Sequence, residues 1–365
     1  MKRNSLSRMS TLLIIAILLA GGAFISTTQS AKASASLSTI YGLHVSGNQL
    51  LNGNGENVRL LGVNRSGTEY KCVNNAGIFD GPSDAASVDA MASWHINVVR
   101  VPLNEDCWLG INGVQDPYTG ANYQQAIEDY VSLLNSRNLM VILDLHWNAA
   151  GSDLSFYQKA MADGDHAYDF WTSVSNTFKN NSSVIFDLYN EPYPSNGDCW
   201  KNGSTSPSTA PCADVPFAAA GMQGMIYTVR NTGATNVILL SGWGYANYIG
   251  GVLDPSYLPS DPQNNEMVST HVYANSGCNT TDCYTSQYAA VAATLPVVMG
   301  ELGENDCQHS FIDTAMNWAD QNNIGYLGWA WDVADCSAFP ALISSYDGTP
   351  TAFGVGFRDH LLSIN

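Results

Sequence analysis

Short apolar segments alternate with longer amphipathic segments along most of the chain. The apolar segments are rich in β-branched and aromatic residues and are closed by breakers, which predicts buried strands at 58–63, 97–101, 140–145, 184–189, 236–240, 267–272, 296–300 and 326–331. The segments between them have the period of amphipathic helices and span 84–95, 122–137, 166–180, 214–232, 283–293 and 309–322. Residues 243–264 predict a loop with a short helix, and residues 354–363 predict the last helix.

Eight strands that alternate with helices predict an α/β fold of the (β/α)8 TIM-barrel class. An open doubly wound sheet is the alternative, but it usually has fewer strands and a glycine-rich first turn. No G-x-G-x-x-G pattern follows the first predicted strand. Residues 41–57 contain Gly47-Asn48 and Asn52-Gly53, which predict a short N-terminal hairpin before the barrel.

Residues 1–35 have the pattern of a secretory signal peptide. Lys2, Arg3 and Arg8 precede an apolar run at 11–24, and the small residues that follow offer cleavage after Ala33 or Ala35. An uncleaved membrane anchor is the alternative, although the run is short for a membrane helix. Residues 36–365 then predict a single domain of a secreted protein that is free of the membrane after processing.

The chain is strongly acidic, with a formal net charge of −18. The four basic residues before position 36 would leave with the signal peptide, which takes the mature chain to about −22. Such a protein is not expected to bind nucleic acid or anionic membranes. A neutral or cationic substrate is expected instead.

Two glutamates stand just past buried strands. Glu191 follows the strand at 184–189, and Glu301 follows the strand at 296–300. The carboxyl ends of parallel barrel strands meet at one face, where barrel enzymes carry their chemistry. Two carboxylates that face one cavity are the minimum equipment for cleaving a glycosidic bond.

Other strand ends are also rich in polar and aromatic side chains. His271 and Tyr273 share a face, because strand side chains repeat every second residue. Asp144 and Asp187 lie inside strands and are expected to pair with buried donors; Asp332 and Glu304 are weaker candidates. The full set of supporting candidates is Arg100, His146, Asn190, His271, Tyr273 and Trp331.

This constellation resembles glycoside hydrolase family 5, the cellulase-type family of retaining enzymes with glutamates after barrel strands 4 and 7. The resemblance covers essentially the whole mature chain and implies that Glu191, in Asn190-Glu191-Pro192, is the acid/base and that Glu301 is the nucleophile. It also implies supporting roles for Arg100, His146, His271 and Tyr273, with Trp331 as an apolar floor under a sugar. Asn190 would bind the 2-hydroxyl of that sugar.

Four further tryptophans lie at or beyond strand ends and are candidates for additional sugar subsites: Trp108, Trp147, Trp200 and Trp243. Packing within the loops is the alternative interpretation of each.

Eight cysteines behind a signal peptide predict disulfides. Zinc ligation is disfavoured because no Cys-x-x-Cys or Cys/His pair has zinc spacing, and free buried thiols remain the alternative. Neighbouring strands of a barrel would bring Cys72 to Cys107 and Cys307 to Cys336. Short loops would join Cys199 to Cys212 and Cys278 to Cys283.

Taken together, the sequence predicts a secreted, retaining β-glycosidase that needs no metal or cofactor and acts as a monomer on a plant-type polysaccharide. β-1,4-Glucan is the first expectation. The alternatives are a β-mannanase or another β-glycosidase, including an exo-acting one, on the same scaffold. A non-catalytic carbohydrate-binding barrel is the alternative of another class, although a binding protein would have no need for both glutamates.

Overall fold

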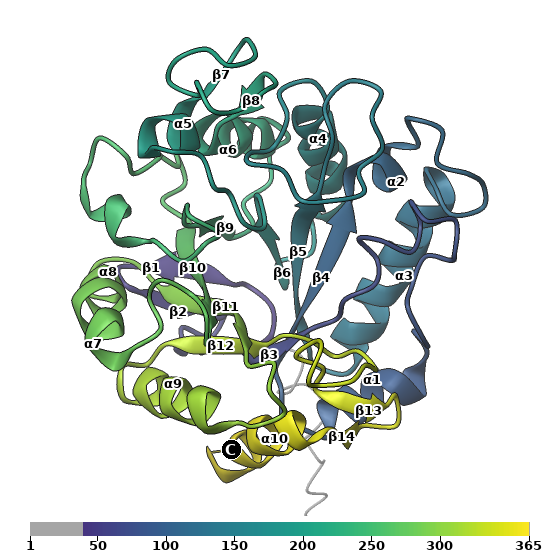
Figure 1. The fold of residues 1–365 in the computed structure, drawn as a ribbon, viewed down its shortest axis with the longest axis vertical. Helices are drawn as coiled ribbons and strands as arrows, with labels where there is room; N and C mark the ends of the chain where they lie inside the picture. Colours follow the sequence, from purple (N-terminus) through teal and green to yellow (C-terminus); the bar gives the residue numbers. More distant parts are fainter. Residues whose placement is uncertain (1–38, 365) are drawn as a thin grey trace, which may run out of the picture. The chain divides into compact units, whose positions relative to one another are not determined.

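The computed structural model describes residues 39–364, and the predicted signal peptide at 1–35 lies outside the described residues. Eight parallel strands close into a barrel in which β12 pairs back to β3, with helices around the outside (Figure 1). This confirms the (β/α)8 prediction. In barrel order the strands are β3 (Leu61–Asn64), β4 (Val98–Asn104), β5 (Met140–Trp147), β6 (Val184–Asp187), β9 (Ile238–Ser241), β10 (Glu266–Tyr273), β11 (Val297–Gly303) and β12 (Gly325–Gly328).

Helices cover the barrel and its loops. They are α1 (Ala85–Ala92), α2 (Glu105–Leu109), α3 (Ala121–Ser136), α4 (Ala167–Phe178), α5 (Gly197–Asn202), α6 (Met222–Asn231), η2 (Gly250–Leu253), α7 (Thr281–Cys283), η3 (Tyr284–Tyr288), α8 (Ala289–Ala292), α9 (Ser310–Gln321) and α10 (Ala352–Ile364). Among residues 39–364, none of these helices has the length and apolar character needed to cross a membrane.

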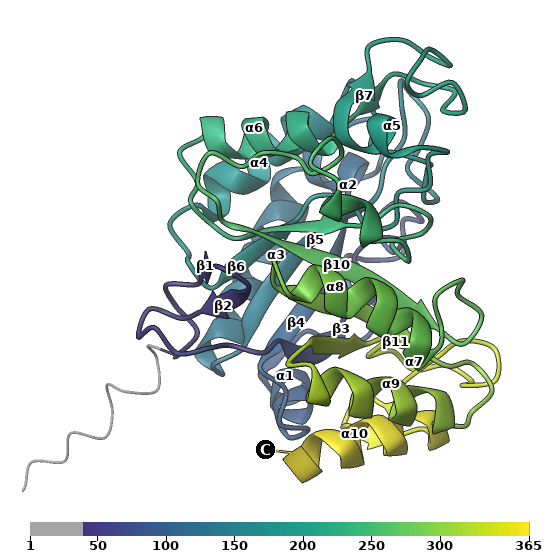
Figure 2. The ribbon, with the colours of Figure 1, turned by 90° about the vertical axis from the view of Figure 1, so that its left-hand side faces the viewer.

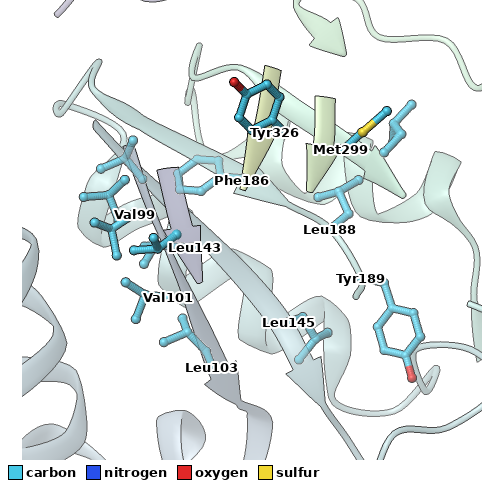
Figure 3. Close-up of a cluster of buried hydrophobic side chains, with 14 of the residues drawn as sticks. Val99, Val101, Leu103, Leu143, Leu145, Phe186, Leu188, Tyr189, Met299 and Tyr326 are labelled. Carbon is cyan, nitrogen blue, oxygen red and sulfur yellow. The ribbon is translucent and has the colours of Figure 1, made fainter. Parts of the chain in front are cut away.

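Side chains of the barrel strands alternate between two apolar layers. Along β4, Val99, Val101 and Leu103 point outward into the layer under the helices, which Figure 3 shows in part. Val98 belongs to the second layer, inside the barrel. The same alternation places Arg100 inside the barrel, where its partners come from the other strands and from the segment that follows β6.

The N-terminal hairpin, β1 (His44–Ser46) with β2 (Gln49–Leu51), is present as predicted. Leu50 of the hairpin and Leu43 before it belong to the same apolar cluster as the inward side chains of the barrel. Figure 2 shows the hairpin at the end of the barrel where the strands begin. One end of the barrel interior is thus sealed by apolar packing, which leaves the other end for polar side chains.

One predicted helix begins later than expected. The segment 214–232 becomes helical only at Met222, because residues before it form a loop in which β8 (Ala219–Ala220) pairs with β7 (Gly203–Ser204). Gly221 allows this close approach, since a Cβ at this position would lie 2.3 Å from the backbone of Asn202. A further small ladder joins β13 (Ile343–Ser345) to β14 (Thr349–Pro350).

Two short helices were not predicted, and they share a sequence pattern. Both α2 and α5 follow an asparagine whose side chain accepts a hydrogen bond from the backbone N–H of a cysteine three residues later. The patterns are Asn104-Glu-Asp-Cys-Trp108 and Asn196-Gly-Asp-Cys-Trp200. Each helix is too short to show an amphipathic period, so only the capping residue signals it.

The four cysteine pairs predicted from the sequence are the disulfides of the structure, and no cysteine of the described residues is free. Cys72–Cys107 joins the loop after β3 to helix α2 after β4, and Cys307–Cys336 joins the loops after β11 and β12. All four bridges lie in segments that follow barrel strands, so they restrain the loops at the polar end of the barrel.

Removing a bridge should cost more stability when the bridge closes a longer loop. The pair Cys72→Ala/Cys107→Ala opens a loop with a sequence separation of 35, and Cys278→Ala/Cys283→Ala opens one of 5. We expect the free energy of unfolding to fall by about 4 kcal/mol for the first pair and about 2 kcal/mol for the second. Denaturant unfolding of the two double variants measures both losses. A larger loss for the shorter loop would contradict the expectation.

Candidate active site

Glu191 and Glu301 face each other at the carboxyl end of the barrel strands. Glu301 lies within β11 and is 3 % exposed, and Glu191 follows β6 on a segment whose backbone continues to bond to the neighbouring strands. A carboxylate oxygen of Glu191 lies within 4.8 Å of one of Glu301. The sequence therefore brings the two predicted glutamates into one place.

Register between the strands aligns the residues around this pair. Arg100 of β4 stands opposite Asn64 of β3, and His271 of β10 stands opposite Glu301 of β11. The second pairing depends on an irregularity between Thr270 and His271, where the register of β10 and β11 shifts by one residue. Without this shift, His271 would stand opposite Gly300.

The guanidinium of Arg100 is the central cation of the site. Its nitrogens lie 2.9 Å from Glu301 Oε1, 2.9 Å from Asp187 Oδ2 and 3.0 Å from Asp144 Oδ2. Burial opposes its charge, but the three carboxylates outweigh burial and raise the pKa of Arg100. Asp144 and Asp187, which are rival carboxylates by sequence, are thereby occupied as its partners.

Glu301 accepts hydrogen bonds at both oxygens. Arg100 Nη1 donates to Oε1 over 2.9 Å, and the hydroxyl of Tyr273 donates to Oε2 over 2.6 Å. Both contacts suit an ionised carboxylate, because a charged acceptor strengthens each bond.

Glu191 has a different environment. Burial raises its pKa, against the opposing influence of His146, Gln158 and Arg100. Its Oε1 lies 2.9 Å from Nδ1 of His271. The two glutamates thus stand in unlike surroundings: Glu301 accepts from Arg100 and Tyr273, and Glu191 lies beside the ring of His271.

Both site histidines are neutral rings. Burial, supported by Arg100, lowers the pKa of His146 to about 3. Burial likewise lowers the pKa of His271 to about 3, although Glu301 acts in the opposite direction. Nδ1 of His146 lies 2.6 Å from Asp144 Oδ2, which orients the ring. A neutral His271 adds no positive charge beside Glu191, so Glu191 can keep a proton.

An open pocket of about 350 Å³ surrounds the two glutamates, a size suited to small ligands. A second pocket of about 280 Å³ adjoins it and shares Glu191, Tyr273 and Asn275 with it. A third, of about 100 Å³, lies where the strands begin and holds neither glutamate. The first pocket is lined by His146, Gln158, Asn190, Glu191, Tyr273, Asn275, Glu301, Asn305, Trp329 and Pro340.

The tryptophan that lines the pocket is Trp329, two residues before the predicted Trp331. Trp331 is fully buried and packs edge-on against Trp94, with ring centroids 4.8 Å apart. Trp329 lines the pocket instead and stacks on His146 at 5.4 Å. Strand β12 ends at Gly328, so the alternation of strand side chains does not extend to these positions. The prediction for Trp331 is therefore wrong in its geometry.

The four additional tryptophans also differ from the subsite prediction. Trp108 and Trp200 are fully buried, and each lies on a short helix. Trp108 packs against aromatic side chains of α3 and α4, and Trp200 packs against Trp243. Their indole N–H groups donate to Ser173 Oγ and to the carbonyl of Ser241. Internal packing, rather than a sugar subsite, is thus the correct interpretation of both.

Trp147 and Trp243 remain partly exposed. Trp147 lies beside Tyr70 and Tyr157, and Trp243 packs against Trp200, Tyr248 and Tyr257. Neither lines the pocket around the glutamates.

Several residues of the pocket were not predicted. Gln158 accepts from Asn190 Nδ2 over 2.8 Å and donates to the carbonyl of Glu191 over 2.8 Å. It lies in the long loop between β5 and α4, where no strand end marks its position. Asn275 and Asn305 also lie in loops, after the ends of β10 and β11, where no strand pattern indicates them.

Two weaker carboxylate candidates have other partners. Glu304 accepts from the backbone N–H groups of Phe311 and Ile312 at the start of α9, which is a favourable place for negative charge. Asp332 accepts from the hydroxyls of Ser66 and Tyr346.

Two groups of titratable side chains in residues 39–364 have the spacing of metal ligands without being part of a disulfide. Glu191, His271 and Glu301 form one, but Arg100 already supplies the cation beside Glu301. Glu105, Asp163 and His166 form the other, in the loops after β4 and β5.

The chain is similar to curated proteins of two named activities. A mannan endo-1,4-β-mannosidase from Salipaludibacillus agaradhaerens is 21% identical over 299 residues, which cover 80% of this chain and 81% of that protein. An endoglucanase from Clostridium saccharobutylicum is 22% identical over 335 residues, which cover 88% of this chain and 64% of that protein.

Solved structures share the fold. A β-glucanase from Saccharophagus degradans in complex with cellotetraose has a TM-score of 0.65 at 17% identity, covering 90% of this chain and 95% of that one. A β-mannanase from Streptomyces thermolilacinus has a TM-score of 0.60 at 22% identity, covering 87% and 97%.

A family model supplies the assignment that these distant likenesses leave open. The model described as cellulase (glycosyl hydrolase family 5) matches residues 51–335, which include both glutamates and every barrel strand. The chain therefore belongs to glycosyl hydrolase family 5, and it is a glycoside hydrolase.

Proposed function

We propose that the protein is a retaining β-glycosidase in which Glu301 is the nucleophile and Glu191 is the acid/base. The observation that carries the proposal is the pair itself: two carboxylates with oxygens within 4.8 Å, in unlike electrostatic environments. Retaining enzymes hold their carboxyl groups about 5–5.5 Å apart, whereas inverting enzymes leave about 6.5–9.5 Å for a water. The short separation supports retention.

In the first step, an oxygen of Glu301 attacks the anomeric carbon as the bond to the leaving oxygen breaks. Glu191 transfers its proton to that oxygen, so the departing sugar leaves as an alcohol. The electron pair of the broken bond stays on the leaving oxygen, and a covalent glycosyl ester forms on Glu301. Because burial raises its pKa, Glu191 can carry the proton that this step needs.

In the second step, Glu191 is ionised and takes a proton from water. The resulting oxygen nucleophile attacks the anomeric carbon and releases Glu301 as a carboxylate. Arg100 and Tyr273 donate to that carboxylate, which favours it as a leaving group. Two displacements at one carbon return the original configuration.

The remaining side chains would position the reacting sugar. Asn190 has its carbonyl held by Arg100 Nη2 and its amide nitrogen held by Gln158, which leaves an N–H for the 2-hydroxyl. Trp329 offers a ring face on which a pyranose can stack. Tyr245 lines the adjoining pocket, where it suits the leaving-group sugars, and Tyr193 stacks on it at 4.5 Å.

We further propose a β-1,4-glucan of plant type as the substrate, since the family model that matches the chain is described as cellulase. The two adjoining pockets share Glu191 and would receive sugars of such a chain. A β-1,4-mannan is the second candidate, and the relative named as a mannan endo-1,4-β-mannosidase supports it. Both activities use the same two carboxylates. The difference lies in how the pocket receives the 2-hydroxyl.

Secretion agrees with the four disulfides, because such bridges persist in oxidising surroundings. We propose that the protein works outside the cell as a monomer, on neutral polysaccharide rather than on nucleic acid or membranes. Side chains fill both chemical roles, so bond cleavage itself is proposed to use neither metal nor cofactor.

Replacing each glutamate should separate the two roles. Glu301→Ala is expected to lose at least about 10⁴-fold in kcat/KM on every substrate, because no nucleophile remains. Glu191→Ala is expected to lose about 10²–10⁴-fold on unactivated oligosaccharides. On an aryl glycoside with a good leaving group, formation of the glycosyl ester should survive, since it needs little acid assistance. Steady-state and burst kinetics on both substrate types measure this.

Glu304→Gln is the matched control for these variants, since it changes a carboxylate of the same strand end that caps α9. It should lower thermal stability and leave kcat/KM near that of the parent. Equal losses by Glu191→Ala on activated and unactivated substrates would contradict the role assigned to Glu191.

The pH profile should follow the raised pKa of Glu191. The acid must be protonated, so kcat/KM on oligosaccharides should fall as pH rises through a value above about 4.3, the ordinary pKa of a glutamate. The same limb should be absent with an activated aryl glycoside, whose departure needs no proton. An identical alkaline limb on both substrates would show that another group controls it.

Substrate choice is tested by initial rates on carboxymethyl cellulose, mixed-linkage glucan, mannan and xylan. A β-1,4-glucan is expected to give the highest kcat/KM. A higher value on mannan would replace the glucan assignment by the second candidate and leave the catalytic roles unchanged.

A further inference from the structure

A second cluster of carboxylates lies beside the active-site loops. Glu105 begins helix α2 directly after β4, and Asp163 lies in the loop that leads from β5 to α4. Both residues are fully buried. One ligand atom from each of Glu105, Asp163 and the nearby His166 lies within 4.8 Å of the other two. The proposed catalysis uses none of them.

This cluster lacks the cation that the active-site carboxylates have. Asp144, Asp187 and Glu301 share Arg100, and buried Asp261 pairs with Arg230 at 2.7 Å. Within residues 39–364, the ion pairs of Glu105 and Asp163 involve only His166, and no Lys or Arg. Two buried negative charges without a cation are strongly unfavourable.

One carboxylate oxygen of the cluster is also without a partner. Glu105 Oε2 is buried and has no hydrogen bond in the described part of the chain, whereas Oε1 accepts only a long contact of 3.4 Å from the backbone N–H of Ala149. Asp163 is better satisfied, by His166 N–H at 2.7 Å and Asn148 Nδ2 at 2.8 Å. The open coordination position thus lies on Glu105.

An imidazole completes the group. Nδ1 of His166 lies 3.9 Å from Glu105 Oε1 and 3.7 Å from Asp163 Oδ1, too far for hydrogen bonds. The same nitrogen has a long hydrogen bond of 3.4 Å to the carbonyl of Ala149, which would become a further oxygen ligand. Separations of this size leave room for a cation that sits about 2.0–2.6 Å from each ligand atom.

We propose that Glu105, Asp163 and His166 bind a divalent transition-metal cation such as Mn²⁺. Carboxylate and carbonyl oxygens suit hard cations, and the imidazole favours a transition metal over Ca²⁺ or Mg²⁺. His166 is 23% exposed in its side chain and Asp165 is exposed, so a cation can enter from solvent. The sequence predicts no metal, because its cysteines lack zinc spacing and these three residues share no local pattern.

The cation would fasten the long loop of residues 148–166 to the end of β4. That loop carries Gln158, which holds both Asn190 and the backbone of Glu191. Asn148 links the two regions, since it binds Asp163 and the hydroxyl of Tyr189. The metal is thus structural, and it lies outside the bond-breaking steps proposed above.

The test uses the mature protein after dialysis against EDTA and then against metal-free buffer. Titration with MnCl2, followed by electron paramagnetic resonance of free Mn²⁺, should show about one bound ion per chain. The melting temperature should rise by about 5 °C when free Mn²⁺ is about 100 times Kd. CaCl2 and MgCl2 at the same concentration should give smaller shifts.

Glu105→Gln should abolish the bound ion and the shift in melting temperature. His166→Ala removes a partly exposed side chain that caps nothing, so it should fold and should weaken Mn²⁺ binding at least about tenfold. Asp261→Asn is the matched control, because its buried carboxylate is neutralised by Arg230. It should lower the melting temperature and keep the full response to Mn²⁺.

Absence of Mn²⁺ binding by the stripped parent, or unchanged binding by His166→Ala, would overturn the proposal. A larger shift with CaCl2 than with MnCl2 would also overturn it, since the imidazole would then have no role. Hydrolysis of an activated aryl glycoside by the stripped protein reports separately on Glu191 and Glu301. Failure of metal binding therefore leaves the catalytic proposal intact, and the reverse also holds.

Discussion

Burial of one guanidinium among three carboxylates is the interaction on which the rest of the site depends. Arg100 reaches Asp144, Asp187 and Glu301 from inside the barrel, and each of the four groups would be costly to bury alone. Removing Arg100 would leave three negative charges in a low-dielectric interior. Removing Asp144 or Asp187 would change the electrostatic potential at Glu301. Fold and chemistry are therefore coupled through this residue.

The barrel makes such an arrangement possible because successive side chains of a strand point alternately outward, toward the helices, and inward. Outward positions of β4 serve the apolar layer under the helices, and inward positions at the sealed end hold apolar residues such as Val98. Arg100 is the next inward-facing residue of β4, two positions after Val98. It lies nearer the carboxyl end of the barrel, which is open to solvent. The shift of register at His271 then brings a neutral ring opposite Glu301. A neutral ring there adds no positive charge beside Glu191, whose pKa is raised by burial.

The sequence was sufficient for whatever the strands position. Arg100 and Glu301 lie within β4 and β11, and Glu191 directly follows β6, so the order of the strands brings them to one face. It was insufficient where a loop or short helix decides the direction of a side chain. The sequence pointed to Trp331 in place of Trp329, because the strand ends before its apolar run does. Trp108 lies on a helix of five residues, which is too short to show an amphipathic period. The Glu105–Asp163 contact joins two loops, and no local pattern reports it.

The central claim is that Glu301 forms a covalent bond to the sugar. A 2-deoxy-2-fluoro glycoside with an activated leaving group slows both steps and lets the glycosyl ester accumulate. Mass spectrometry of the proteolytic digest should find one added fluoroglycosyl group on the peptide that contains Glu301, with loss of activity in proportion. A label on a peptide that lacks Glu301, or rapid turnover with inversion and no labelled protein, would contradict the account.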